Sequence, residues 1–118
     1  MQNSAVITEE TCGATQCAAT LFSMAAHTPA GDGESHPGID ELFYVISGRG
    51  ILYLNGQPIR FEAGDVCFVP MDHQHSVENN GDEVLNLFCV IGRYDELTSL
   101  VKDFKYELLY GDLMIQVF

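Results

Sequence analysis

The chain has 118 residues, enough for one domain with its own hydrophobic core and too few for two. A hydrophobic fraction of 47% excludes a natively disordered chain, which lacks the apolar surface needed to offset the entropy of ordering. The net charge of −12, from 17 acidic and only 5 basic residues, makes nucleic acids and anionic membranes poor partners, because both are bound through Lys and Arg.

The start of the chain, the lengths of its apolar runs and its cysteines together predict a cytoplasmic protein. No basic stretch followed by an apolar one opens the chain, so no signal peptide is expected, and no apolar run is long enough to span a membrane. The four cysteines, Cys12, Cys17, Cys67 and Cys89, include no C-x-x-C pair. Four thiols in a chain with a good core favour a reducing compartment.

The central part of the chain alternates short apolar runs with turn residues. The runs are rich in aromatic and β-branched residues, and they predict strands at residues 42–46, 51–54, 58–62, 66–69 and 84–91. Asn55-Gly56 is a strong hairpin signal between two of these strands. This pattern is typical of an all-β fold, an antiparallel sandwich or barrel.

The two ends of the chain differ from this central part. Residues 1–17 are expected to form an N-terminal arm, residues 18–92 the barrel core, and residues 93–118 an appendage that packs on the barrel or on a partner subunit. Apolar residues at 97, 100, 101 and 104 lie on one face of a helix predicted over residues 95–105. Residues 113–118 are expected to form a final strand or a docking segment.

The residues that can carry chemistry fall in two short windows. The first holds Glu34, His36 and Glu41, and the second holds His73 and His75. Imidazole and carboxylate groups are the usual protein ligands for Zn, Mn, Fe, Ni and Co. Residues two apart on a strand face the same side, so Glu34 and His36 are expected to point into one cavity. Glu41 and His75 each open a predicted strand, and neighbouring strands can bring both to the same ion.

The first window resembles the first motif of the cupins, a family of small antiparallel jelly-roll β-barrels. His36, Glu41 and Gly48 match the second half of that motif at the family's spacing. Glu34 stands where the family usually has the first of two histidines, and Thr28 stands where the leading glycine is expected. Both are departures from the pattern.

The second window resembles the second cupin motif more closely. Gly64, Pro70, His75 and Asn79 match it at every spacing, and Asp72 replaces its inner glycine. A turn position with a positive φ accepts Asp less readily than Gly, but does accept it. Two motifs in the right order make the resemblance specific for the fold over residues 18–92.

The resemblance implies one divalent transition metal ion, with Fe, Mn, Ni and Zn all compatible. It implies His36, Glu41 and His75 as ligands, the two-histidine-one-carboxylate set of non-haem iron sites. Glu34 is a candidate fourth ligand, its alternative being a solvated loop residue. Glu41 and Glu34 are also candidate catalytic bases. His73 is a candidate catalytic or ligand-orienting group, its alternative being an exposed loop histidine.

Several other residues have weaker claims on the site. Asp40 and Asp72 can orient the imidazoles, or can serve only as turn acids. His27 is expected at the rim or on the surface. The inner wall of the barrel is expected to consist of large or apolar side chains: Phe22, Met24, Phe43, Val45, Phe68, Leu87 and Cys89.

The function implied by the resemblance is broad, because oxygenases, isomerases, decarboxylases and lyases all occur on small cupins. We expect a metal-dependent enzyme that acts on a small organic molecule, with oxygenase or isomerase chemistry on a carbonyl or enol substrate. The alternative is a non-catalytic cupin that binds a sugar-like molecule. Burying two histidines and a carboxylate together is costly without an ion, which favours the enzyme. The apolar tail favours a homodimer.

Overall fold

The computed structural model describes residues 2–92 and 114–116. Over these residues the chain forms nine strands and one helical turn: β1 (Gln2–Ile7), α1 (Glu9–Cys12), β2 (Cys17–Met24), β3 (Asp40–Ser47), β4 (Arg49–Leu54), β5 (Gln57–Glu62), β6 (Asp65–Val69), β7 (His75–Glu78), β8 (Leu85–Gly92) and β9 (Met114–Gln116). The helix predicted over residues 95–105 lies outside the described residues.

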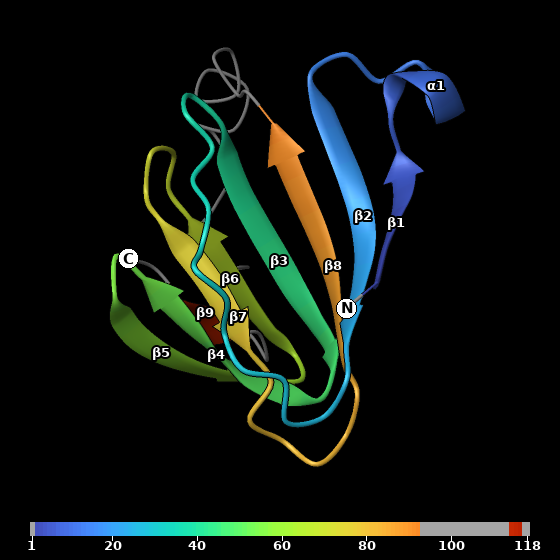
Figure 1. The fold of residues 1–118 in the computed structure, drawn as a ribbon. Helices are drawn as coiled ribbons and strands as arrows, with labels where there is room; N and C mark the ends of the chain where they lie inside the picture. Colours follow the sequence, from blue (N-terminus) through green and yellow to red (C-terminus); the bar gives the residue numbers. More distant parts are fainter. Residues whose placement is uncertain (1, 93–113, 117–118) are drawn as a thin grey trace.

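Two sheets face each other and form the barrel (Figure 1). The larger sheet has the strand order β1-β2-β8-β3-β6-β9, and the smaller has the order β5-β4-β7. All neighbouring strands run antiparallel except β6 and β9, which are parallel. The expected all-β, antiparallel jelly-roll barrel is confirmed. No helix in the described part of the chain is long and apolar enough to cross a membrane.

The first 17 residues, expected to form an arm, contribute an edge strand. β1 pairs with β2 and extends the larger sheet. The helical turn α1 follows, capped at its start by Thr8, whose side chain accepts a hydrogen bond from the backbone N–H of Thr11. The Thr11 hydroxyl in turn accepts from the backbone N–H of Thr8, so the two threonines form a capping box.

Two predicted turns have the backbone geometry that their residues suggest. Asn55 and Gly56 have φ values of 49° and 83°, the left-handed pair that a tight hairpin between β4 and β5 requires. Asp72 has a φ of 67°, so it adopts the left-handed conformation expected at the glycine position that it replaces. Its carboxylate accepts a hydrogen bond from the backbone N–H of Gly38 at 3.2 Å.

The core lies between the two sheets. Val45, Leu52 and Leu85 are completely buried, and six of the seven predicted wall residues belong to this core or pack against it. The prediction for Phe68 is wrong. It pairs with Leu42 in the register of β3 and β6, whereas the buried Phe43 pairs with Cys67, so Phe68 points to the outer face of the larger sheet.

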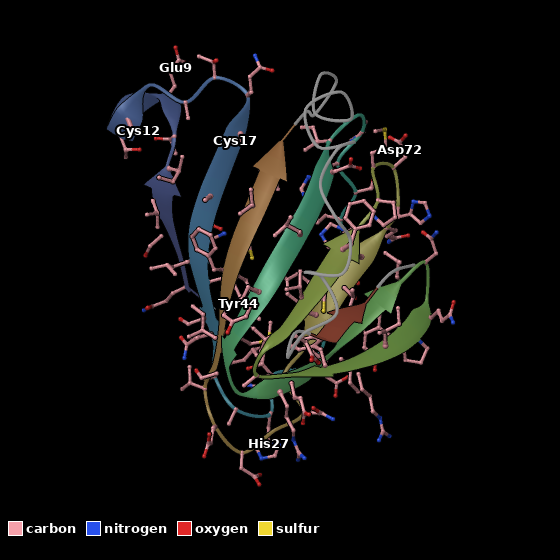
Figure 2. The ribbon with its side chains drawn as sticks, turned by 180° about the vertical axis from the view of Figure 1, so that it is seen from behind. Glu9, Cys12, Cys17, His27, Tyr44 and Asp72 are labelled. Atoms are coloured by element: carbon pink, nitrogen blue, oxygen red, sulfur yellow. The ribbon has the colours of Figure 1, made fainter. Side chains whose placement is uncertain are left out.

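The outer face of the larger sheet carries partly exposed apolar side chains. Leu21 and Ile46 are each 46% exposed and Tyr44 is 37% exposed. Figure 2 shows Tyr44 on this face, seen from behind the barrel. Such a surface suits contact with another chain. The homodimer stays a prediction.

A buried asparagine links two segments of the chain at one end of the barrel. The Asn79 side chain is fully buried, and its amide nitrogen donates to the backbone carbonyls of Met24, Ala25 and Glu83 at 3.0, 3.0 and 2.9 Å. Its Oδ1 accepts from the backbone N–H of Gly81 at 2.9 Å. Asn79 therefore joins the end of β2 to the turn before β8.

We expect Asn79→Ala to lower the free energy of unfolding by about 3 kcal/mol, because it leaves two buried and two partly buried backbone hydrogen bonds unmade. Chemical denaturation measures the change. Asn80→Ala is the matched control, because Asn80 Oδ1 is buried and accepts no hydrogen bond from the described residues, so its removal should cost little. Equal stability of the two variants would contradict the role of Asn79.

Candidate metal centre

The loop between β2 and β3 carries two of the candidate ligands to the site. In Figure 1 this loop runs from the end of β2 across the open side of the barrel to the start of β3. It forms two isolated bridges at the two ends of β7: Thr28 pairs with Asn79, and Glu34 pairs with His75. At the second bridge, Glu34 and His75 exchange two backbone hydrogen bonds of 2.9 Å. The loop is thus fixed along β7.

Gly33 permits this bridge. Its φ is 89°, which strains any residue with a side chain, and a Cβ at this position would also lie only 3.0 Å from the backbone oxygen of His75. The expectation that Glu34 and His36 share a strand is therefore wrong. They point to one place because Glu34 is bridged to His75 and because a turn follows at residues 37 and 38, not because of strand alternation.

His75 is the most deeply buried imidazole of the cluster, with 8% of its side chain exposed. Its Nδ1 lies 3.4 Å from the backbone carbonyl of His73, which accepts the Nδ1 proton. A proton on Nδ1 leaves the lone pair of Nε2 free to point into the cluster. This is the tautomer that a metal-binding histidine needs.

Glu41 lies between the two imidazoles. Its Oε2 is 3.0 Å from Nε2 of His75 and 3.5 Å from Nε2 of His36, and its side chain is only 14% exposed. No hydrogen bond to this buried oxygen comes from the described residues. When His75 is neutral with its proton on Nδ1, the lone pairs of this oxygen and of Nε2 face each other at 3.0 Å with no proton between them. A buried polar atom in this state is costly, and a cation removes the cost.

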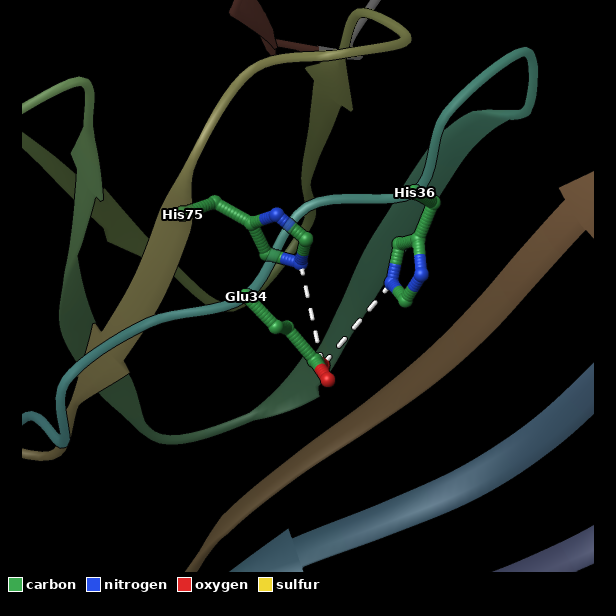
Figure 3. Close-up of side chains that lie close together, drawn as sticks. All are labelled: Glu34, His36 and His75. Atoms are coloured by element: carbon green, nitrogen blue, oxygen red, sulfur yellow. Dashed lines mark ion pairs between the residues drawn. The ribbon is translucent and has the colours of Figure 1, made fainter.

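Glu34 completes the group from the solvent side. Its Oε1 lies 3.8 Å from Nε2 of His36 and 4.0 Å from Nε2 of His75, with its side chain 71% exposed (Figure 3). The ligand atoms of Glu34, His36 and His75 all lie within 4.8 Å of one another. Glu41 approaches the same two imidazoles from the strand β3.

The donor set fits one divalent transition metal ion. Two imidazoles and one or two carboxylates form the mixed nitrogen and oxygen set that Fe, Mn, Ni and Zn accept. The buried oxygen of Glu41, which faces two imidazole nitrogens and accepts no hydrogen bond while His75 is neutral, is the observation that favours a cation here. The cluster is therefore a candidate site for one such ion.

Burial and the polar groups around His75 shift its pKa in opposite directions. Burial lowers the pKa of the imidazole. The short contact with Glu41, the charge of Glu41, the carbonyl of His73 and the charge of Glu34 raise it by more, so the net pKa lies above the ordinary value of 6.5. A proton and a metal ion therefore compete for the same nitrogen.

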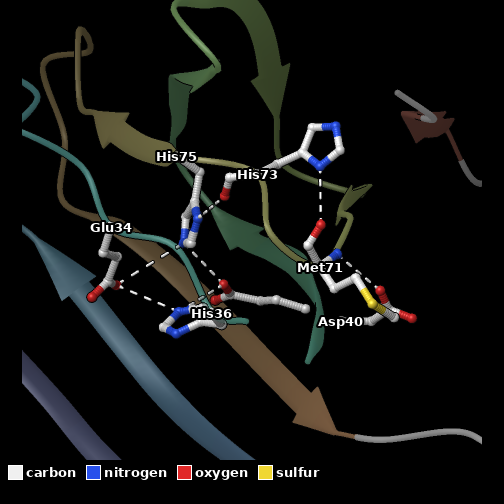
Figure 4. A network of polar contacts seen from close by, with 7 residues as sticks. Glu34, His36, Asp40, Met71, His73 and His75 are labelled. Carbon is white, nitrogen blue, oxygen red and sulfur yellow. Dashed lines mark hydrogen bonds and ion pairs between the residues drawn. The ribbon is translucent and has the colours of Figure 1, made fainter. Parts of the chain in front are cut away.

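The other candidate residues do not join the cluster. The His73 ring points away from it and contacts the backbone carbonyl of Met71 at 3.0 Å, so only its own carbonyl serves the site (Figure 4). The Asp40 carboxylate accepts from the backbone N–H of Met71 at 3.0 Å, and Asp72 accepts from Gly38. Both acids hold turns together. His27 pairs with Asp82 at 2.7 Å, at the other end of the barrel from Asp72 (Figure 2).

A cavity of about 730 Å³ opens beside the cluster and between the sheets. Glu34, His36, Glu41 and His75 form part of its lining. Inward-facing side chains from β2 and β8 form another part: Ala18, Thr20, Phe22, Met24, Leu87, Cys89 and Ile91. Sequence reasoning missed Ala18, Thr20 and Ile91. The signal that identifies them is their spacing: each lies two residues from a predicted inward-facing residue, or from another of the three, on the same strand, and therefore faces the same side.

Comparisons with known proteins agree with this architecture. A family model described as "Cupin domain" matches residues 20–91. The chain is 39% identical over 56 residues to an oxalate-binding protein of Thermotoga maritima, which covers 48% of this chain and 46% of the relative. It is 30% identical over 83 residues to the tetracenomycin polyketide synthase protein TcmJ of Streptomyces glaucescens. This match covers 66% of this chain and 52% of the relative. The chain spans about half the length of the curated relatives it matches.

Solved structures show the same fold. A structure described as a predicted oxalate decarboxylase from Thermotoga maritima has a TM-score of 0.62 and 26% identity, covering 77% of this chain and 78% of that one. A cupin protein from Bacteroides fragilis has a TM-score of 0.69 and 18% identity, covering 81% of both chains. At this lower identity the likeness concerns the fold alone.

We expect the purified protein to bind about one equivalent of metal, and His75→Ala to weaken binding at least tenfold through the loss of a buried ligand. Metal content after loading with Co²⁺ and desalting measures this. His73→Ala is the matched control, because its ring lies outside the cluster and its carbonyl is retained. If His75→Ala and His36→Ala both keep wild-type metal content while folded, the site is not where we place it.

We also expect metal affinity to rise with pH. In the metal-free protein, protonated His75 stabilises the fold fully below 6.5, and this contribution is lost as the pH rises through the raised folded pKa. Metal requires the neutral imidazole, so apparent affinity should rise about tenfold per pH unit up to that pKa and then level off for this group. Co²⁺ titrations over a pH series measure it. An affinity independent of pH would contradict the assignment of His75.

Proposed function

Since the chain belongs to the cupin family, as the match over residues 20–91 shows, we propose that it is a metal-dependent enzyme acting on a small organic molecule. His36, Glu41 and His75 hold one divalent transition metal ion, Glu34 is a fourth ligand that can leave the ion, and the adjacent cavity binds the substrate. The reaction is of oxygenase or isomerase type on a carbonyl or enol compound. The observation that supports the proposal is the buried Oε2 of Glu41, which lies 3.0 and 3.5 Å from the Nε2 atoms of two imidazoles and needs a positive charge beside it.

The metal, when bound, supplies Lewis-acid polarisation of a substrate oxygen, and iron or manganese also supplies one-electron chemistry. The chain's residues divide the remaining work between them. The carbonyl of His73 holds the His75 ring in one orientation. Glu41, largely buried, is a permanent member of the donor set.

Glu34 is the candidate base. Its carboxylate is mostly exposed and stands further from the imidazoles than Glu41 does, so it can turn toward a substrate without emptying the site. It takes a proton from the carbon beside the substrate carbonyl, which leaves the electron pair on the enolate. In an isomerase it returns that proton to a neighbouring atom, and the charges balance at the end of the cycle.

The named relatives are compatible with a substrate that presents oxygen to the metal. One is an oxalate-binding protein, and oxalate is a small dicarboxylate. Another is a polyketide synthase protein, and polyketides carry carbonyl groups. Both chemistries offer oxygen atoms to the metal, which supports a carbonyl, carboxylate or enol group at this position.

The alternative, a non-catalytic cupin that binds a sugar-like molecule, has less support from the cavity. A sugar needs a dense set of hydrogen-bonding partners. The lining facing away from the metal ligands is mainly apolar, and Thr20, Thr28, Ser76 and Asn3 are its neutral polar members. A metal-free, folded protein that binds a sugar would establish this alternative in place of the enzyme.

We expect the metal-loaded protein to turn over members of a panel of α-keto acids and β-diketones. Deuterium incorporation in deuterated water, followed by NMR, detects proton transfer, and an oxygen electrode detects dioxygen uptake. Chelation should abolish either activity. Glu34→Gln should lower proton transfer at least about a hundredfold while the metal content stays within a few-fold of wild type.

Glu62→Gln is the matched control, since Glu62 is an exposed carboxylate at the end of β5, away from the cavity. It should leave activity and metal content as they are. If Glu34→Gln keeps full activity, Glu34 is not the base. If it loses the metal, Glu34 is an essential ligand.

A further inference from the structure

The inward-facing side chains of the larger sheet form rows that start at the metal ligands. In the register of β3, β8 and β2, Glu41 is level with Ile91, and Ile91 with Ala18. One step along the strands, Phe43 is level with Cys89 and then Thr20. Adjacent strands lie about 4.8 Å apart, so each row reaches about 10 Å sideways from β3 to β2.

In these rows the side chains of β3 below Glu41 are buried, whereas side chains of β8 and β2 are partly exposed to the cavity. Phe43 is 2% exposed and Val45 is completely buried, so the wall next to Glu41 along β3 is packed. By contrast, five side chains of β2 and β8 that line the cavity keep partial exposure: Ala18, Thr20, Phe22, Cys89 and Ile91. We name these five residues the side wall. The open part of the cavity thus extends sideways from the metal ligands.

The side wall carries no charge. Four of its five residues are apolar or behave so, and the fifth, Thr20, is neutral. Burial, with a smaller effect of Glu41, raises the pKa of the Cys89 thiol to about 12, so Cys89 stays a neutral thiol and contributes apolar surface. The charged groups among the cavity-lining residues are Glu34, Glu41 and the two histidines, all at the metal cluster.

We propose that the substrate of this site is amphipathic, with a carbonyl or enol oxygen group at the metal ligands and an apolar or aromatic body on the side wall. This inference rests on the proposed function and names the substrate class of the same site. A small dicarboxylate such as oxalate reaches the metal ligands but leaves the side wall uncovered. An apolar body removes that wall from water, so the wall favours larger ligands by an amount that grows with the area covered.

Two β-diketones that differ only in their body test the proposal. Acetylacetone and benzoylacetone carry the same chelating group, and benzoylacetone replaces one methyl group by a phenyl ring. Calorimetric titration into the Zn²⁺-loaded full chain measures each affinity, because Zn²⁺ has no redox chemistry that would consume the ligands. Titration of free Zn²⁺ corrects for the intrinsic difference between the two. Benzoylacetone should bind at least about tenfold more tightly after this correction, and oxalate should show no such gain.

Variants of the side wall show where the preference arises. Ala18→Leu fills the open part of the wall, and Phe22→Ala removes its aromatic ring. Each should reduce the corrected preference for benzoylacetone several-fold while leaving acetylacetone and Zn²⁺ affinity close to wild type. Leu21→Ala is the matched control, because Leu21 follows the same strand on the outer face and is 46% exposed. Since Phe22 packs against the core, Ala18→Leu keeps the test decisive if Phe22→Ala fails to fold.

The outcomes separate the two proposals. If Zn²⁺ binds but the corrected affinities of the diketones are equal, or oxalate binds best, the amphipathic substrate is wrong and the metal-dependent enzyme still stands. If the preference survives Ala18→Leu unchanged, the side wall is not its source and the inference fails. If the folded protein binds no metal, both proposals fall together.

Discussion

The pair of backbone hydrogen bonds between Glu34 and His75 is the constraint on which the site depends. The loop from β2 to β3 has little regular structure of its own, and these bonds fix it along β7. They place the Glu34 carboxylate beside the His75 ring, and two residues later the chain delivers His36. Gly33, with no Cβ to strike the His75 carbonyl, lets the two backbones approach. The barrel alone supplies only Glu41 and His75.

Sequence reasoning recovers the parts of this arrangement that depend on chain spacing. His36, Glu41 and His75 are predicted together because the motif spacings reflect strand lengths and turns, which the residues between them determine. The left-handed turn at Asp72 is also predictable, since the motif requires a positive φ there. Fold class follows from the same information, because short β-rich runs separated by turns leave few all-β architectures.

The parts that fail depend on side-chain direction, which spacing does not determine. Phe68 lies in an apolar run, and the choice of face depends on a register that only the pairing with β3 sets. His73 is two residues from His75, but the turn before β7 directs its ring to the carbonyl of Met71. Strand alternation predicts that Glu34 lies in the site, but Glu34 reaches the site through a backbone bridge between distant segments. The open side wall appears only when both sheets are in place.

The unequal environments of the two carboxylates connect the metal centre to its chemistry. A buried Glu41 facing two imidazoles needs a positive charge beside it at all times, and either a proton on His75 or a metal ion provides one. The contact with Glu41 and the charges of Glu41 and Glu34 raise the pKa of His75, which favours a positive charge at this nitrogen. Glu34, exposed at the mouth, is under no such constraint, because water can solvate it. One carboxylate is therefore committed to holding a cation, and the other is free to move a proton.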